Sequence, residues 1–387
     1  MSKQLTRRGL LATGISASLL GSVAFAAAAG GRKLVVIVAR GGMDGLSVSP
    51  PVGDPNYAVL RGAIAIPASA ALKLDETFGL HPKLANLHRL ARVGQARIAP
   101  AAAIPARIRS HFDAQDLLEN GASRVYGASS GWLNRALNTG PAPLKALSVG
   151  AQTPLILRGP VQAQSWSPGR GLDEQAERLA SMLQDLYAGD ALLGPAFASG
   201  LQTEAMADAL NGATPIDARN AGALAVSTAR FLTAPQGPSI AVLSLGGFDT
   251  HARQGAVDGQ LAGRLQVLDE TIAGLESGLG ATWKDTVVIV VTEFGRTARV
   301  NGTLGLDHGT ASTLVLAGGA LKRGGIIGDW PGLAERSLFE NRDLAPTLDV
   351  RSVFKGVLVE HLGLDAARVN AAVFPDSAGA RAVTGLV

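Results

Sequence analysis

Acidic and imidazole side chains gather just past the ends of two strongly apolar segments, residues 240–245 and 287–291. A Gly-rich loop then leads to a further Asp-His pair. In an open α/β sheet the ligand site lies at the carboxyl ends of the strands, so we expect these side chains to meet there. Carboxylates and imidazoles both bind metal ions. The predicted metal-binding residues of this stretch are Asp249, His251, Glu293, Asp307 and His308.

The ligand chemistry is restricted because the chain contains no cysteine. Imidazole and oxygen ligands suit Zn or Mn, whereas carboxylate-rich positions suit Mg or Ca, so the sequence does not resolve the divalent ion. Asp249 and His251 could face one ion across a tight turn. Asp307 and His308 are adjacent, so their side chains diverge and could serve two ions about 4 Å apart, as in two-metal hydrolases. The pattern therefore fits either one ion or two.

Two positions nearer the N-terminus complete the candidate site. Asp44 follows the apolar run 33–39 and a pair of glycines, and it is either a turn or capping aspartate or a further metal ligand. Ser110 begins a predicted helix, and Asp113 three residues later gives it the spacing of a capping pair. The alternative role of Ser110 is that of a nucleophile at a helix N-terminus, where backbone N–H groups favour an incoming anion. Ser47 is a weaker rival because it lies in a strand-like run.

Arginines and the remaining histidines form the last set of candidates. Arg296 and Arg109 could each bind an oxyanion, because a guanidinium matches the geometry of phosphate and sulfate, but an ordinary ion pair explains either residue as well. His111 lies two residues from Asp113 and resembles the other Asp-His pairs. Three histidines are expected to pack or to sit at helix ends, namely His81, His88 and His361.

Strands alternate with helices along the chain, which predicts an α/β fold with a mostly parallel, doubly wound sheet. Residues 160–235 are patterned in Ala and Leu with few strand signals, and they predict a helical insertion. Residues 33–39, 240–245 and 287–291 predict central strands. The other predicted elements are strands 96–100, 147–149, 155–157, 313–317 and 324–328, and helices 83–92, 130–138, 258–279 and 348–362.

The first residues predict export. A twin-arginine pair at Arg7-Arg8 precedes an uncharged run, and Ala24-Phe25-Ala26 fits a cleavage site, so residues 1–28 are predicted to be a twin-arginine signal peptide. An uncleaved membrane anchor is the alternative. Export would make the protein periplasmic or secreted, with no stable membrane span after cleavage.

Bulk composition excludes several function classes. The 387 residues are 47% hydrophobic and 17% charged, which suffices for one large domain over residues 29–387. Three of the positive charges behind the formal +4 lie in the predicted leader, so the rest of the chain is close to neutral. It therefore has no broad attraction for nucleic acid or anionic membranes. Aromatic residues make up only 4%, which disfavours stacking on bases.

Several motifs together resemble a known family. They are the twin-arginine leader, LVVIVARGGMDGLS, HPKLANL, RSHFDAQD, LGGFDTHARQ, VVTEFGRT and DHGTAS. With these motifs the chain resembles the bacterial exported family called domain of unknown function fifteen-oh-one, over nearly all of the predicted mature chain. That family is similar to the alkaline phosphatase, sulfatase and cofactor-independent phosphoglycerate mutase superfamily. The resemblance implies a three-layer α/β/α sandwich with a metal site at the carboxyl edge of the sheet.

The resemblance also implies residue roles. Ser110 matches the nucleophile, and Asp44 matches the aspartate that shares a metal with it. Asp249 with His251 matches one ion's ligands, and His308, with Asp307, matches the late metal-binding histidine. Glu293-Phe294 stands where the superfamily usually has an Asp-His pair, so the resemblance fits one ion as well as two.

The implied activity is metal-dependent hydrolysis of a small phosphate or sulfate ester, with a serine nucleophile and an arginine that stabilises charge. The alternative is a catalytically silent binding or assembly partner of another exported protein, which the altered ligand set motivates.

Overall fold

The structure, a computed structural model, describes residues 31–140, 142–168, 174–212, 216–217 and 219–387. The predicted signal peptide lies outside the described residues and stays a prediction. Within the described part of the chain, no helix combines the length and apolar character needed to cross a lipid bilayer.

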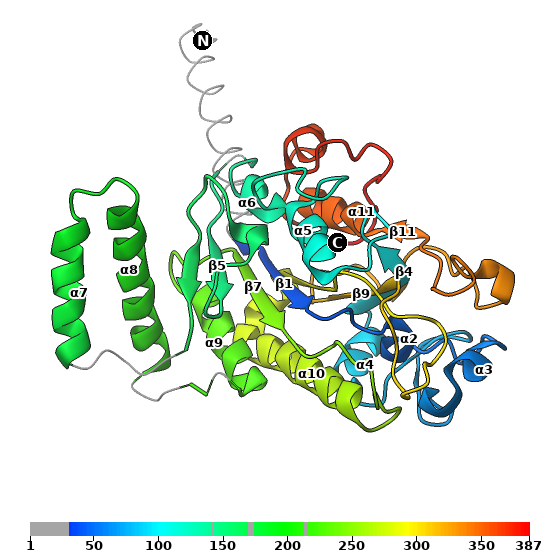
Figure 1. The fold of residues 1–387 in the computed structure, drawn as a ribbon. Helices are drawn as coiled ribbons and strands as arrows, with labels where there is room; N and C mark the ends of the chain where they lie inside the picture. Colours follow the sequence, from blue (N-terminus) through cyan, green and yellow to red (C-terminus); the bar gives the residue numbers. More distant parts are fainter. Residues whose placement is uncertain (1–30, 141, 169–173, 213–215, 218) are drawn as a thin grey trace, which may run out of the picture.

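One mixed sheet organises the described residues, with strand order β10-β4-β9-β8-β1-β7-β5-β6 and β11 paired to β4 (Figure 1). β9 runs antiparallel to β8 and β4, whereas the other pairs are parallel. The strands are β1 Lys33–Ala39, β4 Ala96–Ala103, β5 Ala146–Val149, β6 Gln164–Trp166, β7 Ile240–Leu245, β8 Thr286–Val291, β9 Ser312–Ala317, β10 Gly325–Ile326 and β11 Leu348–Asp349, with a separate hairpin of β2 Leu72–Lys73 and β3 Gly79–Leu80.

Helices cover both faces of this sheet, so the predicted three-layer α/β/α fold is confirmed. Alternate residues of β1 enter opposite layers: Val36 packs with α5, α6 and α11, and Val35 packs with α4, α9 and α10. The helices are α2 Gly45–Val48, α3 Tyr57–Arg61, α4 Ala85–Arg92, α5 His111–Asn120, α6 Trp132–Leu137, α7 Glu174–Tyr187, α8 Leu193–Asn211, α9 Ala221–Thr233, α10 Gln260–Leu279, α11 Val350–Gly356 and α12 Ala366–Arg368.

An apolar stripe on α10 faces the sheet and is buried; its residues recur every three to four positions and are Leu261, Leu265, Leu268, Ile272 and Leu275. Full burial of one such side chain stabilises the fold by about 1.5–3 kcal/mol. On its other side α10 meets α9 closely because two positions lack a side chain. A Cβ added to Gly274 would lie 2.6 Å from the carbonyl oxygen of Gly222. One added to Gly278 would lie 2.7 Å from the Cβ of Ala229. The two glycines therefore set the spacing of these helices.

Residues 160–235 are largely helical, but the segment also contains β6 at the sheet edge and α9 against the sheet. Only α7 and α8 stand off the body, as the green pair at the left of Figure 1.

Two predicted elements were wrong. Residues 155–157 form a 3-10 turn rather than a strand, because this loop turns back so that the Ile156 N–H reaches the Glu119 carboxylate at 3.0 Å. The predicted helix 348–362 begins with the short strand β11, and α11 starts only after Asp349, whose side chain accepts a hydrogen bond from the Arg351 N–H and so caps the helix. The helix then widens into a π-helical turn, Val357–His361.

Candidate metal centre

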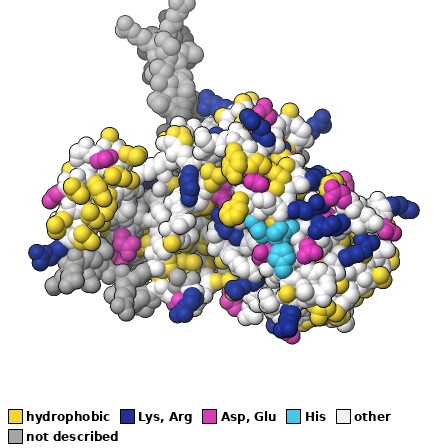
Figure 2. Space-filling model, viewed as in Figure 1, with side chains coloured by type: hydrophobic (Ala, Val, Ile, Leu, Met, Phe, Trp, Pro, Cys, Tyr) yellow, Lys and Arg dark blue, Asp and Glu magenta, His cyan; other side chains and the backbone are white. Residues whose placement is uncertain are grey.

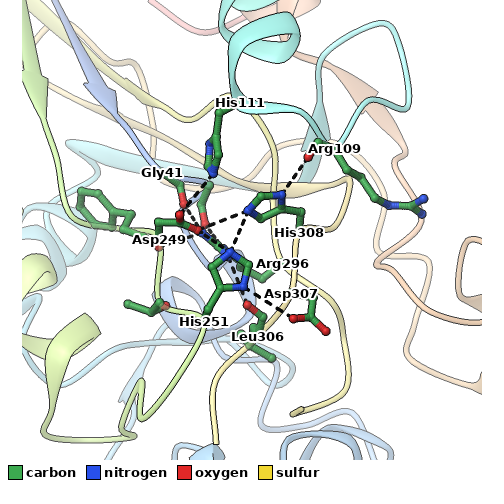
Figure 3. Close-up of polar contacts among 12 residues, drawn as sticks. Gly41, Arg109, His111, Asp249, His251, Arg296, Leu306, Asp307 and His308 are labelled. Atoms are coloured by element: carbon green, nitrogen blue, oxygen red, sulfur yellow. Dashed lines mark hydrogen bonds and ion pairs between the residues drawn. The ribbon is translucent and has the colours of Figure 1, made fainter. Parts of the chain in front are cut away.

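His111, Asp249 and His308 each offer a ligand atom within 4.8 Å of the other two beyond the carboxyl ends of β7 and β8, and His251 lies beside Asp249 and His308 as the fourth convergent side chain (Figure 3). Asp249 is central: its Oδ1 lies 3.0 Å from His251 Nε2 and 3.4 Å from His308 Nε2, and its Oδ2 lies 3.5 Å from His111 Nε2. The two Nε2 atoms of His251 and His308 are 2.9 Å apart. Figure 2 shows the histidines at the surface of this face beside acidic side chains, so small molecules can reach them.

The chain reaches this geometry through a glycine turn after β1. Gly41 and Gly42 have φ values of +113° and +68°, which side-chain-bearing residues rarely adopt. A Cβ on Gly41 would lie 2.7 Å from the Asp249 nitrogen, and one on Gly42 would lie 2.5 Å from the Phe294 ring. The glycines therefore let the loops after β7 and β8 close over the end of β1.

Each histidine of the centre has its Nδ1 next to an oxygen. His111 Nδ1 is 2.8 Å from Glu293 Oε1, His308 Nδ1 is 2.8 Å from the carbonyl oxygen of Arg109, and His251 Nδ1 is 3.6 Å from Asp307 Oδ1. A carbonyl or an ionised carboxylate only accepts hydrogen bonds, so the ring proton belongs on Nδ1 of His111 and His308. The Nε2 lone pairs are then available at the centre, as in metal sites whose histidines are oriented by an outer oxygen.

The Nε2 atom of His111 tests whether these residues fit a metal ion. This atom is buried and has no hydrogen-bond partner within the described residues. Leaving a buried polar atom unpaired costs about 1–3 kcal/mol, which a bound cation would relieve. Three imidazole nitrogens and one carboxylate suit a borderline ion such as Zn, whereas Mg and Ca prefer an all-oxygen set. The residues present therefore fit one transition-type divalent ion.

Electrostatics favour a cation here. Burial alone would raise the pKa of Glu293, but hydrogen bonds from His111, Gly41 and Gln115 outweigh it and hold the pKa below its usual range. Burial alone would also raise the pKa of Asp249, but the contacts with Arg296, His251 and His111 outweigh it and hold this pKa below its usual range. Two ionised carboxylates therefore face the imidazoles at neutral pH. The hydrogen bond to Glu293 raises the pKa of His111, while burial lowers that of His308.

Glu293, predicted as a ligand, lies behind His111. It is fully buried, and its Oε1 accepts hydrogen bonds from the Gly41 N–H at 2.8 Å, from His111 Nδ1 and from Gln115 Nε2 at 3.3 Å. With Oε1 engaged in this way, Glu293 orients His111. Asp307 has a corresponding position behind His251, but it is half exposed and the contact is longer.

Asp44 is placed apart from the four convergent side chains. Its carboxylate is 1% exposed and pairs with the fully buried Arg61. It also accepts hydrogen bonds from Ser47 Oγ at 2.6 Å and Gln254 Nε2 at 2.8 Å. The positive charge next to Asp44 therefore comes from the guanidinium of Arg61. The same contacts bury Ser47, the rival nucleophile.

Arg296 is buried and links neighbouring loops, so it does not form an open anion site. Its guanidinium contacts Asp249 Oδ1 and the carbonyl oxygen of Gly41, and it donates to the carbonyl oxygens of Gly42 at 2.7 Å and Leu306 at 3.1 Å. These partners come from three separate loops, so Arg296 fixes the loops and the Asp249 carboxylate together. Arg109 pairs with Asp343 and Glu340.

Ser110 lies exposed immediately before α5, between two residues that contribute to the centre. The Arg109 carbonyl holds His308, and His111 opens the helix. The predicted capping pair with Asp113 is absent: within the described residues, the Ser110 side chain makes no capping hydrogen bond. The hydroxyl is therefore not committed to the helix end.

His111 is the residue that the predicted ligand set omits. Its sequence signals are its spacing of two residues from Asp113 and its position in RSHFDAQD, directly after Ser110 and at the start of a helix. Its partners, Asp249 and Glu293, lie 138 and 182 residues further along the chain, so only the fold brings them together.

Comparison with solved structures gives distant similarities of fold. A phosphonate monoester hydrolase of Agrobacterium radiobacter aligns with 86% of this chain and 74% of its own, at 14% identity and a TM-score of 0.37. The C-terminal periplasmic domain of EcEptC from Escherichia coli, in complex with Zn, aligns over 74% and 72% at 10% identity and a TM-score of 0.37. Alkaline phosphatase from the Antarctic bacterium TAB5 aligns over 76% and 93% at 11% identity and a TM-score of 0.38.

Sequence comparison gives the family. No curated protein matches the chain. A family model described as protein of unknown function, DUF1501, matches residues 91–374, which is most of the sequence. The chain therefore belongs to the DUF1501 family.

Proposed function

We propose that this protein hydrolyses phosphate or sulfate esters with one divalent metal ion held by His111, Asp249, His251 and His308. The observation that carries the proposal is the buried Nε2 of His111, which faces Asp249 and has no hydrogen-bond partner among the described residues. A bound divalent ion supplies Lewis-acid polarisation of the ester. Zn fits the donor set best, and Mn is the next candidate.

Ser110 is the proposed nucleophile. Its Oγ attacks phosphorus or sulfur, the ester alcohol leaves, and water then releases the product from the serine. The position at the N-terminus of the ten-residue helix α5 supports this role, because free backbone N–H groups there stabilise negative oxygens. Arg296 acts indirectly, by holding Asp249 in place.

The test combines metal analysis with kinetics. Purified protein should contain one equivalent of Zn and hydrolyse p-nitrophenyl phosphate or p-nitrophenyl sulfate. Asp249→Asn and His111→Ala should lose the metal. Ser110→Ala should keep the metal and lose turnover.

His88→Ala is the matched control, because His88 is a partly exposed histidine on α4 whose ring hydrogen-bonds to the Lys73 carbonyl oxygen, away from the centre. It should retain both metal and activity. Metal-free protein, or full activity in Ser110→Ala, would contradict the proposal.

A second candidate function is that of an exported binding partner, and the outer side of α7 favours it. Leu179, Met182 and Leu186 recur at helical spacing and are 56%, 69% and 72% exposed, while Tyr187 faces Phe197 of α8. An apolar stripe of this kind is common at protein interfaces. Co-purification of a second exported chain, lost in Met182→Glu, together with a metal-free centre, would favour this function over hydrolysis.

Export remains a proposal that rests on the leader. Replacing Arg7 and Arg8 by lysine should retain the protein in the cytoplasm, as measured by cell fractionation. Unchanged periplasmic or secreted protein would exclude the twin-arginine route.

A further inference from the structure

A cleft of about 560 Å³ lies beside the centre, within the range of about 300–1,000 Å³ typical of ligand pockets. It is bounded by α5 on one side and by the loop 150–158 on the other. Its floor includes residues at the ends of β1, β5 and β7, so it opens on the same sheet edge as the metal ligands.

Gln115 connects this cleft to the centre. Its Nε2 donates to Glu293 Oε1 at 3.3 Å, and its Oε1 accepts from Arg40 Nη1 at 3.0 Å. Phe112, the residue after His111, also lines the cleft. A molecule whose ester group sits at His111 would therefore extend its organic part along α5 into the cleft.

Charge in the cleft is balanced. Arg40 pairs with Glu119 at 2.7 Å, and the carboxylate of this pair is 4% exposed. The other two charged lining residues, Arg158 and Asp116, also have opposite signs. A cleft of net zero charge gives no electrostatic gain to a polyphosphate or a polycation. The organic part of the ligand should therefore be uncharged.

The remaining lining residues distinguish among neutral ligands. Gln152, Thr153 and Ser244 offer both donors and acceptors, and within the described residues the Nη groups of Arg158 make no hydrogen bond. A purely apolar ligand would desolvate these groups without pairing them. Phe112 adds one flat apolar surface that is 82% exposed. A ring with one C–H face and several hydroxyl groups matches both features.

We infer that this cleft binds a sugar, so that the substrate is a sugar phosphate or sugar sulfate. The identity of the ester rests on the proposed hydrolase function, whereas the binding of the sugar does not. The C–H face of the sugar packs on Phe112, and its hydroxyls pair with the amide, hydroxyl and guanidinium groups opposite.

The test separates binding from turnover. Zn-loaded protein is mixed with glucose, galactose, mannose and N-acetylglucosamine, and binding is measured by saturation-transfer NMR. Rates are then measured on the 6-phosphate and 6-sulfate of each sugar and on ethyl phosphate and ethyl sulfate. At least one sugar should bind, and its ester should exceed the ethyl ester at least 10-fold in kcat/KM.

Phe112→Ala should weaken binding of that sugar by roughly 3- to 10-fold and lower the preference for its ester by the same factor. Val59→Ala, an equally exposed apolar residue on α3 outside the cleft, should change neither. If no sugar binds, or if Phe112→Ala binds sugar as the wild type does, the inference is overturned. Sugar binding that depends on Phe112, without hydrolysis of any ester, would support the sugar-binding cleft and refute only the proposed hydrolase activity.

Discussion

Buried His361 should make the folded protein sensitive to acid over a defined range. The side chain is 1% exposed, and burial lowers its pKa to about 4 from the ordinary 6.5. Its Nε2 donates to the Lys33 carbonyl oxygen at 2.9 Å, and Arg32 and Asp285 are the charged groups near it. The neutral imidazole thus links the π-helical turn that follows α11 to the start of β1.

The lowered pKa fixes the sign of the effect. Below pH 6.5 the unfolded chain protonates this histidine, whereas the folded chain does so only near pH 4, so acid favours unfolding between these values. Because only the unfolded state binds this proton at pH 5, the free energy of unfolding is about 2 kcal/mol lower at pH 5 than at pH 7. The full loss, reached below pH 4, is about 3 kcal/mol.

The assay is urea unfolding of metal-free protein at pH 7 and pH 5, comparing wild type with His361→Gln. Glutamine keeps a donor for the Lys33 carbonyl but does not titrate, so the variant should lose about 2 kcal/mol less than wild type between the two pH values. His88→Gln, at a partly exposed position on α4, should behave as wild type. Equal losses in wild type and His361→Gln would refute the reasoning.

Three further outcomes are expected. Glu293→Gln should weaken Zn binding by about 10- to 100-fold in calorimetric titration, because the carboxylate that orients His111 is lost, and unchanged affinity would remove Glu293 from this role. Arg296→Lys should lower the free energy of unfolding by about 2–4 kcal/mol, because one ammonium cannot replace a guanidinium that reaches three loops. A loss below about 0.5 kcal/mol in urea unfolding would show that Arg296 does not hold these loops together. Gly42→Ala should lower the thermal midpoint because its Cβ would clash with Phe294 at positive φ, whereas Gly302→Ala, with open space around it, should not.

The central fold was predictable because local pattern and tertiary position agree there. β1, β7 and β8 are continuous apolar runs, as strands buried on both faces must be. The stripe on α10 likewise repeats every three to four residues. The segment 155–157 was misjudged since three apolar residues do not distinguish a strand from a tight turn.

The site was only partly predictable because its chemistry depends on distant pairings. Position at a strand end indicated Asp249 and His251, and an Asp-His pair after a Gly-rich loop indicated His308; the structure brings the three together. The same rule indicated Asp44, but it carries no information about a buried arginine 17 residues later. Likewise, the sequence suggested an anion-binding role for Arg296, and only the fold shows how many backbone carbonyls it serves.

The strand order has a consequence for synthesis of the chain. β1 lies between β7 and β8, so its two neighbours emerge from the ribosome about 200 and 250 residues after it. At roughly 5–20 residues per second, the apolar segment Lys33–Ala39 waits about 10–40 s for β7 with both edges unpaired. Over that interval it is the part of the nascent protein most in need of a chaperone, and slowing translation between β1 and β8 should increase aggregation rather than aid folding.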